Sequence, residues 1–350
     1  MNKSVLIAMS GGVDSSVAAW LLMQEGWLCQ GAVMRLLPDA CGPQKDVQDA
    51  GQVAALLGIP FEVLPFQDNF RKDVIDPFVR AYQEGRTPNP CLECNRCLKF
   101  GRFLHAAEDR GLHSVATGHY ARVEFDSVRG RWLLKKALDL PKDQSYFLYS
   151  LSQYQLGRTL FPLGALTKQQ VREIAEQQGF VNAGKHDSQD ICFVPDGDYA
   201  GFIQRWTGAP LVPGDFLDLN GQIVGRHRGA VRYTLGQRKG LGLAMGAPVY
   251  VCGKDMGANT VTVGPEDVLF SRRVRVENLN WIAIENLSGP LRVKVKLRSR
   301  HLEQWAVIQP EEHGVLAVFD ELQRAVTPGQ AAVFYDGDSV VGGGTIVAAE

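Results

Sequence analysis

The chain has 350 residues, of which 45% are hydrophobic and 21% are charged, and its formal net charge is −1. A chain of this length and composition is expected to fold into two or three globular domains rather than to be disordered. Because the net charge is near zero, any affinity for nucleic acid must come from a local patch. No apolar run approaches the roughly 20 residues of a membrane span, so we expect a cytoplasmic protein that does not engage a membrane. In that reducing compartment, seven cysteines favour thiol chemistry or metal binding over a disulfide framework.

The first half of the chain alternates segments typical of strands with segments typical of helices. The predicted strands are 4–9, 28–34, 61–66 and 114–118, and the predicted helices are 15–25, 46–57, 68–83 and 97–110. This order predicts a parallel sheet with helices on both faces. Two further helices are predicted at 145–156 and 167–178, and Thr167 and Gln170 fit a capping box at the start of the second.

Helical periodicity is lost after about Trp206, and glycine, proline and β-branched residues become frequent. Short alternating runs at 230–234, 248–252, 260–263 and 292–297 predict strands of one or two small β domains. The run Gly342-Gly343-Gly344 predicts a turn or a bulge before a last strand.

The most informative motif is Ser10-Gly11-Gly12-Val13-Asp14-Ser15-Ser16, which directly follows the apolar run at 5–9. Two adjacent glycines let the backbone turn its N–H groups toward an anion, and the helix start behind them adds partial positive charge. The serine hydroxyls can donate to phosphate oxygens, and Asp14 can hold a magnesium ion. The motif does not end in the Gly-Lys-Ser/Thr of a Walker loop. It also lacks the Gly-x-Gly-x-x-Gly pattern of a dinucleotide-binding turn. An ordinary strand–turn–helix would need one capping serine, so the motif predicts a phosphate-binding loop.

A second motif contains Cys91, Cys94 and Cys97 in a C-x2-C-x2-C spacing. This spacing commonly gathers thiolates around a metal or a cluster. We expect the segment to open a helix, whose dipole lowers a thiol pKa, and Arg96 and Lys99 act in the same direction.

Other interpretations of the cysteines stay open. A structural zinc site would need a fourth ligand from Cys192, His119 or His186. Cys192 lies about a hundred residues after Cys94, so only the fold can bring them together. The remaining cysteines are treated separately: Cys29 and Cys252 are interpreted as small buried hydrophobes, and Cys41 and Cys97 receive no role.

The first motif resembles the pyrophosphate loop of the ATP pyrophosphatases, which cleave ATP to AMP and pyrophosphate and activate a carbonyl oxygen by adenylation. Taken with six further motifs, the chain resembles the tRNA-specific 2-thiouridylases, which replace the C2 oxygen of the wobble uridine with sulfur. These motifs span nearly the whole chain: Asn-Pro-x-x-x-Cys-Asn at 89–95, Ala-Thr-Gly-His-Tyr-Ala-Arg at 116–122, Lys-Asp-Gln-Ser-Tyr-Phe-Leu at 142–148, Asp-Ser-x-x-Ile-Cys-Phe at 187–193, Tyr-Thr-Leu-Gly-Gln-Arg-Lys-Gly-Leu-Gly at 233–242 and Thr-Pro-Gly-Gln-x-x-Val-Phe-Tyr at 327–335.

The resemblance implies an α/β fold, with an N-terminal parallel sheet flanked by helices, like the adenine nucleotide alpha hydrolases, followed by two small β domains. The expected domains are a catalytic domain over 1–205 with both catalytic cysteines, a central β domain over 206–270, and a barrel-like domain over 271–350 that contacts tRNA.

The resemblance also implies the site residues. Cys94 is the expected nucleophile, and Cys192 is expected to carry the persulfide sulfur and to form a transient disulfide with Cys94. ATP with Mg²⁺ is expected at Ala8, Met9, Ser10, Gly11, Gly12, Val13, Asp14, Ser15, Met34 and Gly118. The target base is expected at Asn89, Pro90 and Cys91. Contacts with tRNA are expected at His119, Lys142, Asp143, Gln144, Arg298, Ser299 and Gln330. The implied partners are tRNA and a sulfur donor protein, either a cysteine desulfurase or a relay protein.

The chain departs from the common family pattern at Cys91, where many members have aspartate. Three thiolates, Cys91, Cys94 and Cys192, with an open fourth position would suit a [4Fe–4S] cluster that binds a loose sulfide. A persulfide relay and cluster-bound sulfur therefore both stay open, with no metal site certain. Glu93 and Asp190 are candidates for the acid–base role of the missing aspartate.

Basic and apolar residues alternate over 292–300. On one strand, the five basic residues would share a face at a spacing of about 7 Å, close to that of successive phosphates; they are Arg292, Lys294, Lys296, Arg298 and Arg300. This face is a candidate to follow the phosphates of RNA. The alternative is a solvated face whose charge prevents edge pairing.

Two other functions stay open at this point. A small-molecule ATP pyrophosphatase would explain residues 10–16 but neither the cysteines nor the basic segment. A non-catalytic RNA-binding iron–sulfur carrier would explain the cysteines and the basic segment but would leave Asp14 without a use. Cleavage of ATP to AMP that tRNA stimulates distinguishes the three.

Overall fold

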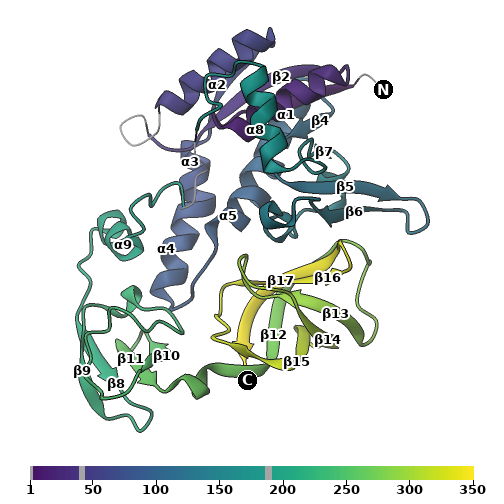
Figure 1. Cartoon of the computed structure of the whole chain (residues 1–350). Helices are drawn as coiled ribbons and strands as arrows, with labels where there is room; N and C mark the ends of the chain where they lie inside the picture. Colours follow the sequence, from purple (N-terminus) through teal and green to yellow (C-terminus); the bar gives the residue numbers. More distant parts are fainter. Residues whose placement is uncertain (1–2, 39–43, 186–190) are drawn as a thin grey trace.

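The computed structural model describes residues 3–38, 44–185 and 191–350 (Figure 1). The strands form a five-stranded, a four-stranded and an eight-stranded sheet. In Figure 1 the first sheet and its helices lie at the top, and the other two sheets lie below it.

The five-stranded sheet is parallel and has the order β3-β2-β1-β4-β7. Its strands are β1 (Ser4–Ala8), β2 (Leu28–Arg35), β3 (Phe61–Pro65), β4 (Ser114–Ala116) and β7 (Thr159–Leu160). All of β1 is buried, which is why its sequence is an almost continuous apolar run. The four strands predicted in the first half are confirmed.

Helices cover both faces of this sheet. Val5 and Ile7 pack with α1 (Val13–Gln24), α2 (Gln44–Leu57) and α8 (Lys168–Gln177). Leu6 and Ala8 point to the other face, where they join the core formed with η2 (Cys94–Arg102) and α6 (Phe103–Glu108). The predicted α/β class is therefore confirmed.

Two of the predicted helices contain π-helical stretches. The segment predicted at 68–83 is α3 (Gln67–Phe70), the π-helix η1 (Arg71–Ile75) and α4 (Asp76–Gln83). The helix predicted at 97–110 starts earlier, with α5 (Pro90–Glu93), and continues through the π-helix η2 into α6. The predicted start is wrong because Asn89 Oδ1 accepts a hydrogen bond from Cys91 N at 3.1 Å and Pro90 fits the first turn.

The helix predicted at 145–156 is wrong. Residues Ser145–Phe147 form a 3₁₀ turn, η4, and a separate capping box at Ser152 starts the short helix α7 (Gln153–Leu156). The apolar residues between them, such as Leu148 and Leu151, are buried in the core without helical periodicity. The helix predicted at 167–178 is confirmed as α8, with the predicted capping box.

A hairpin of β5 (Ala121–Asp126) and β6 (Arg131–Lys136) was absent from the sequence-based elements. It joins the eight-stranded sheet by pairing with β17 (Ser339–Ala349), where Lys135 faces Ser339. Arg131 Nε also donates to the carbonyl of Ile282 at 2.9 Å. The hairpin therefore ties the N-terminal part of the chain to its C-terminal part (Figure 1).

The four-stranded sheet follows α9 (Tyr199–Thr207) and has the order β10-β11-β8-β9. Its strands are β8 (Gly214–Leu217), β9 (Ile223–His227), β10 (Tyr250–Asp255) and β11 (Thr260–Gly264). The strand predicted at 230–234 is wrong: Ala230–Arg232 form the 3₁₀ turn η5, in which Ala230 is buried beside Phe216 in the core of this domain. The strands predicted at 248–252 and 260–263 are confirmed.

Six strands of the last sheet close into a barrel, because β12 pairs with both β15 and β17. They are β12 (Phe270–Trp281), β13 (Leu291–Lys296), β14 (Gln304–Glu311), β15 (Gly314–Arg324), β16 (Ala331–Asp336) and β17. The predicted strand at 292–297 and the barrel-like last domain are confirmed. The remaining short turns are η3 (Leu140–Lys142) and η6 (Glu266–Leu269).

The glycine run at 342–344 lies inside β17, so the predicted turn is wrong. A Cβ on Gly342 would lie 2.5 Å from the Asn280 carbonyl oxygen, and a Cβ on Gly344 would lie 2.4 Å from that of Glu277. The glycines thus allow neighbouring backbone to approach closely where the barrel closes.

Over the described ranges, no helix is both long and apolar enough to cross a membrane.

Candidate active site

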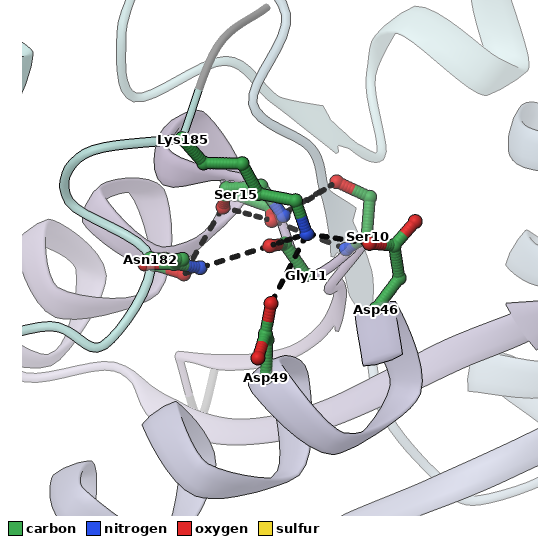
Figure 2. Close-up of polar contacts among 9 residues, drawn as sticks. Ser10, Gly11, Ser15, Asp46, Asp49, Asn182 and Lys185 are labelled. Carbon is green, nitrogen blue, oxygen red and sulfur yellow. Dashed lines mark hydrogen bonds and ion pairs between the residues drawn. The ribbon is translucent and has the colours of Figure 1, made fainter. Parts of the chain in front are cut away.

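The predicted phosphate loop connects the carboxyl end of β1 to α1. Serine hydroxyls hold its shape: Ser15 Oγ donates to the Gly12 carbonyl at 3.0 Å, and Ser10 N donates to Ser15 Oγ at 3.1 Å (Figure 2). No described side chain caps the start of α1. Its first N–H groups are therefore available to an anion, as the motif predicts.

Close backbone contacts explain two glycines of the site. Gly11 has a φ of +71°, and a Cβ there would lie 2.2 Å from the carbonyl oxygen of Asp46 in α2. A Cβ on Gly118 would lie 2.7 Å from Ser15 N. Met34 lies near the carboxyl end of β2, next to β1. The structure thus brings together the residues predicted to bind ATP, namely 8–15, Met34 and Gly118.

Two side chains from the loop after α8 reach the back of the phosphate loop (Figure 2). Asn182 Nδ2 donates to the Gly11 carbonyl and to Ser16 Oγ, both at 3.0 Å. Lys185 Nζ donates to the same carbonyl at 3.1 Å, to Asp49 at 3.1 Å and to Asp46. Burial opposes the charge, but these carboxylates raise the pKa of Lys185, so it stays an ammonium at the loop.

The proposed magnesium ligand Asp14 is paired with protein groups. Lys168 Nζ contacts its two carboxylate oxygens at 2.7 and 2.8 Å, and Tyr120 OH donates to Oδ1 at 2.9 Å. Lys168 is buried at the first turn of α8. A cation and a carboxylate therefore meet at the entry to α1, where phosphate charge is expected.

The fold brings together the two cysteines that are distant in sequence. Phe193 packs against Phe78 at 5.2 Å between ring centroids and joins the buried cluster that contains Cys94, so its neighbour Cys192 is held nearby. The pKa of Cys94 is raised to about 12, chiefly by burial; Lys99 lowers this pKa, and the thiols of Cys192, Cys91 and Cys97 contribute to raising it. Cys94 is buried, whereas Cys91 and Cys192 are exposed, which suits one sheltered thiol and one that a partner can reach.

The π-helical register places a cation on the face of Cys94. In an α-helix, a residue five positions on lies roughly 140° around the axis. In a π-helix, it lies one turn above, because its N–H bonds the carbonyl five residues earlier. Lys99 is five residues after Cys94 in η2, and it lowers the pKa of Cys94 and Cys192 against the larger effect of burial.

His119 lies at the end of β4, beside the same lysine. Burial, helped by the charge of Lys99, lowers the pKa of His119 well below its usual 6.5. Its Nδ1 shares a hydrogen bond with Thr117 Oγ1 at 2.7 Å, and its ring packs at 5.7 Å from that of Phe100. It is a neutral imidazole between the phosphate loop and the thiols.

Among the described side chains, no group of three or more His, Cys, Asp or Glu residues is placed to hold a metal ion. Cys91, Cys94 and Cys192 belong to that described part. His186, Cys41 and Asp190, which the sequence raised as a zinc ligand, an unassigned cysteine and an acid–base candidate, lie outside the described residues. Cys29 is buried as interpreted, whereas Cys252 is only half-buried, and both thiols donate to backbone carbonyls.

Several residues expected at tRNA hold protein structure instead of projecting freely. Asp143 accepts hydrogen bonds from Ala137 N at 3.0 Å and Ser145 Oγ at 2.8 Å. Gln144 Oε1 accepts from Tyr120 N at 2.9 Å. Lys142, which precedes them, is half-buried.

The barrel residues expected at tRNA are similarly engaged. Arg298 Nη2 donates to Thr327 Oγ1 at 2.6 Å and to the Ala325 carbonyl. Gln330 Nε2 donates to the Thr87 carbonyl at 2.6 Å. Ser299 is half-buried in the turn after β13.

The predicted five-residue basic face is shorter than expected. The strand β13 ends at Lys296, so Arg298 and Arg300 lie in the following turn and leave the alternation. Arg292 pairs with Asp320 through both guanidinium nitrogens. Arg292 and Lys294 also lie over the half-exposed ring of Trp305, at 5.0 and 5.3 Å from its centroid. The predicted basic face is too long because the chain leaves the strand conformation after Lys296.

Comparison with known proteins gives the family. Three family models match in chain order: a tRNA methyl transferase HUP domain over 3–196, a tRNA methyl transferase PRC-barrel domain over 200–265, and an aminomethyltransferase β-barrel domain over 271–346. The tRNA-specific 2-thiouridylase MnmA of Acetivibrio thermocellus is 49% identical, covering 99% of each chain. The chain belongs to the tRNA-specific 2-thiouridylase family. The enzyme of that name from Heliobacterium modesticaldum is 48% identical over 99% of this chain and 93% of its own.

More distant solved structures include a 4-thiouridine synthetase–RNA complex with bound ATP. It is 18% identical, with a TM-score of 0.38, and the match covers 55% of this chain and 45% of that one. A likeness this low carries no argument about the reaction.

For this 2-thiouridylase family member, sequence reasoning missed three side chains at the site, Lys168, Asn182 and Lys185 around the phosphate loop. It named Lys99 as a cation that lowers a thiol pKa, but not the π-helical register that places Lys99 on the face of Cys94. Lys168 follows a recognisable helix cap, and Lys185 lies just before the motif at 187–193, but neither signal names a partner. Glu93, one acid–base candidate, is paired with Arg96 at 2.5 Å.

Proposed function

We propose that this protein uses ATP to replace the C2 oxygen of the wobble uridine of tRNA with sulfur. The observation that carries the proposal is that Phe193, next to Cys192, packs into the same buried cluster as Cys94, in the part of the chain whose parallel sheet presents the phosphate loop at its carboxyl edge. In open parallel sheets this edge is where ligands bind. The names of the relatives, which cover the full length of the chain, support the same reaction.

The phosphate loop would bind ATP, with Gly11, Gly12 and the start of α1 facing the phosphates. The uridine C2 oxygen then attacks the α-phosphate, and pyrophosphate leaves. Asp14 suits Mg²⁺ because carboxylate oxygen is a preferred ligand, and the ion would neutralise phosphate charge. Lys168, released from Asp14, can hold the same charge. The result is an adenylated oxygen that leaves as AMP.

The sulfur step would use two thiols. The terminal sulfur of a Cys192 persulfide attacks C2 and displaces AMP. The Cys94 thiolate attacks Cys192 Sγ, so the bond between Cys192 and the transferred sulfur breaks and its electron pair goes to the thiocarbonyl product. An external dithiol reduces the remaining Cys94–Cys192 disulfide to two thiols before the next turnover and is itself oxidised to a disulfide. A cysteine desulfurase or a relay protein would supply the persulfide at exposed Cys192.

The alternative of a [4Fe–4S] cluster on Cys91, Cys94 and Cys192 has less support. The described thiols are not grouped as a set of three metal donors, and Cys94 is buried with a raised pKa. A relay needs only two thiols that meet. A non-catalytic RNA-binding carrier would give no purpose to the phosphate loop and its lysines.

In this proposal, residues 1–205 form the catalytic domain, 206–270 form a central domain, and 271–350 form a barrel that contacts tRNA. The protein would act in the cytoplasm. The expected base contacts are Asn89, Pro90 and Cys91, where α5 begins. His119 would lie against the RNA as a neutral imidazole, and Lys294 and Lys296 would add phosphate contacts.

The test is thiolation of tRNA by single-cysteine variants. Cys94→Ser and Cys192→Ser should each abolish formation of 2-thiouridine while ATP still binds. The matched control is Cys252→Ser, at a half-buried thiol in the central domain, which should keep full activity. Full activity in either of the first two variants would refute the proposed relay.

A further inference from the structure

The segment 84–89 links α4 to α5 and so leads directly to Asn89, Pro90 and Cys91. It contains no helix or strand. Its start is fixed by Arg86 N, which donates to the carbonyl of Ala81 at 2.9 Å. Beyond Arg86, the Asn89 carbonyl accepts a hydrogen bond from Leu92 N in α5 at 3.2 Å, and the hydrogen bonds to the backbone of Thr87 come from the C-terminal barrel.

The barrel turn 327–330 lies against this segment. Thr87 N donates to the Pro328 carbonyl at 3.0 Å, and Gln330 Nε2 donates to the Thr87 carbonyl at 2.6 Å. Gly329, with a φ of +90°, has no Cβ, and one would lie 3.1 Å from Arg86 Cβ. Both backbone polar groups of Thr87 are therefore satisfied by one turn of another domain.

The turn is itself held in place. Gly329 N donates to the Ile346 carbonyl at 2.9 Å, and Ile346 N donates to the Gln330 carbonyl at 2.8 Å. Arg298 Nη2 bonds Thr327 Oγ1 at 2.6 Å. Arg298 and Gln330, which the resemblance assigns to tRNA contact, thus belong to one hydrogen-bond network. This network extends to Thr87.

The central domain closes the other side of the segment. A Cβ on Gly85 would lie 3.0 Å from Met256 Cγ and 4.0 Å from Lys254 Cε, both in or beside β10. The Nζ of Lys254 is buried and has no hydrogen-bond partner within the described ranges. The segment is therefore confined between the two C-terminal domains.

We propose that Gln330 is a positioning residue of the reaction: its bond to Thr87 fixes the segment that presents Asn89 and Cys91 to the target base. The expected effect on kcat rests on the proposed function, because it requires that the target base binds at α5. The mechanical part, a barrel side chain holding the 84–89 backbone, stands on the bonds themselves. Since Arg298 stabilises the same turn, RNA bound at the barrel would act on the active site through this contact.

The test compares Gln330→Met, which removes the donor at similar size, with the matched control Gln323→Met. Gln323 lies in β15, and its Nε2 donates to the carbonyl of Glu321 in its own strand. Gln330→Met should lower kcat for tRNA thiolation by about three- to tenfold, with KM for tRNA changed less than about twofold. The control should change neither constant.

A second readout needs no turnover. Amide hydrogen exchange over residues 84–90 of the free protein should be faster in Gln330→Met and unchanged in Gln323→Met. If Gln330→Met raises KM for tRNA but leaves kcat and amide exchange unchanged, Gln330 is an RNA contact only and the inference is overturned. If KM, kcat and amide exchange are all unchanged, the inference is also overturned. If Gln330→Met melts well below the wild type, Gln330→Glu, which also cannot donate, replaces it. Wild-type protein without thiolation activity refutes the proposed function instead, and faster exchange would still support the contact.

Discussion

Lys99 is the cation of the π-helix η2 that acts on Cys91, Cys94 and Cys192. Desolvation by the surrounding protein raises the pKa of buried Cys94 and also of Cys91 and Cys192, which keep exposed surface, and Lys99 opposes this at each of the three thiols. The thiols are therefore mostly protonated at neutral pH, and the thiolate fraction grows as pH rises. Lys99 increases that fraction at any given pH.

Lys99→Met should consequently shift the alkylation of these cysteines by iodoacetamide to higher pH. Removing an opposite charge near a thiol is worth about one pKa unit, so the rate at mildly alkaline pH should fall about tenfold. The measurement is the rate of modification against pH, followed by mass spectrometry of the peptides.

The control for that experiment is Lys72→Met, at an exposed lysine of the neighbouring π-helix η1. It should leave the profile in place. An identical profile for Lys99→Met and the wild type would show that Lys99 does not act on the thiols.

Single residues were predictable by type but not by partner. The motif at 10–16 identified Asp14 and the serines, because phosphate binding requires such groups after a strand. Its partner Lys168 lies 154 residues away, and no local pattern encodes that distance. For Lys99, the sequence predicted the effect on the thiols, but its place on the face of Cys94 depends on a π-helical register that side-chain periodicity does not reveal.

Among the elements, the β1–α1 turn depends most on one glycine. Gly11→Ala would combine a left-handed φ with a Cβ 2.2 Å from the backbone of α2. We expect a loss of about 2–4 kcal/mol in the free energy of unfolding, as backbone strain and overpacking add, together with loss of ATP binding.

Gly26→Ala is the matched control, because Gly26 has a φ of +76° with nothing within 4 Å of its Cβ position. It should cost about 1 kcal/mol and leave ATP binding intact. Denaturant melts and ATP titration measure both effects. Equal losses of stability in the two variants would mean that the backbone at Asp46 moves aside for the Cβ at little cost in free energy.

Elements with strong local signals were predicted well. The buried strands of the parallel sheet and the capped helix α8 follow from continuous apolar runs and from the Thr167 capping box. The helix predicted at 145–156 was wrong because the buried residues of this irregular segment have a spacing similar to that of a helix. The strand predicted at 230–234 failed for a similar reason, since Ala230 is buried in a turn.

At the scale of the whole molecule, the basic residues of β13 lie on the barrel, where Arg292 is exposed and Lys294 and Lys296 are half-buried. Because Arg292 already pairs with Asp320, Lys294 and Lys296 are the stronger candidates for phosphate contacts. Lys294→Gln with Lys296→Gln should weaken tRNA binding and reduce the slope of log affinity against log salt by about two.

The control is Lys3→Gln with Lys72→Gln, which removes the same charge from the catalytic domain. Fluorescence titrations over a range of salt concentrations provide both slopes. The same affinity and slope for all variants would make the β13 lysines a solvated face with no role in binding.

The arrangement of the domains could not be predicted from the sequence. Composition separates the helical first half from the β-rich second half. It does not show that the β5–β6 hairpin leaves the first half to pair with β17, nor that the turn 327–330 holds Thr87. Both depend on contacts between residues about two hundred positions apart or more, so the junction beside the proposed base site appears only in the folded chain.

The central claim is that two thiols, without a cluster, transfer sulfur to an ATP-activated uridine. The most direct measurement incubates iron-free protein with tRNA, Mg²⁺, ATP and a persulfide donor, and quantifies 2-thiouridine at the wobble position together with AMP. We expect 2-thiouridine and AMP to form in equal amounts, and neither to form with Cys192→Ser. Thiolation that appears only after iron and sulfide are restored would contradict it.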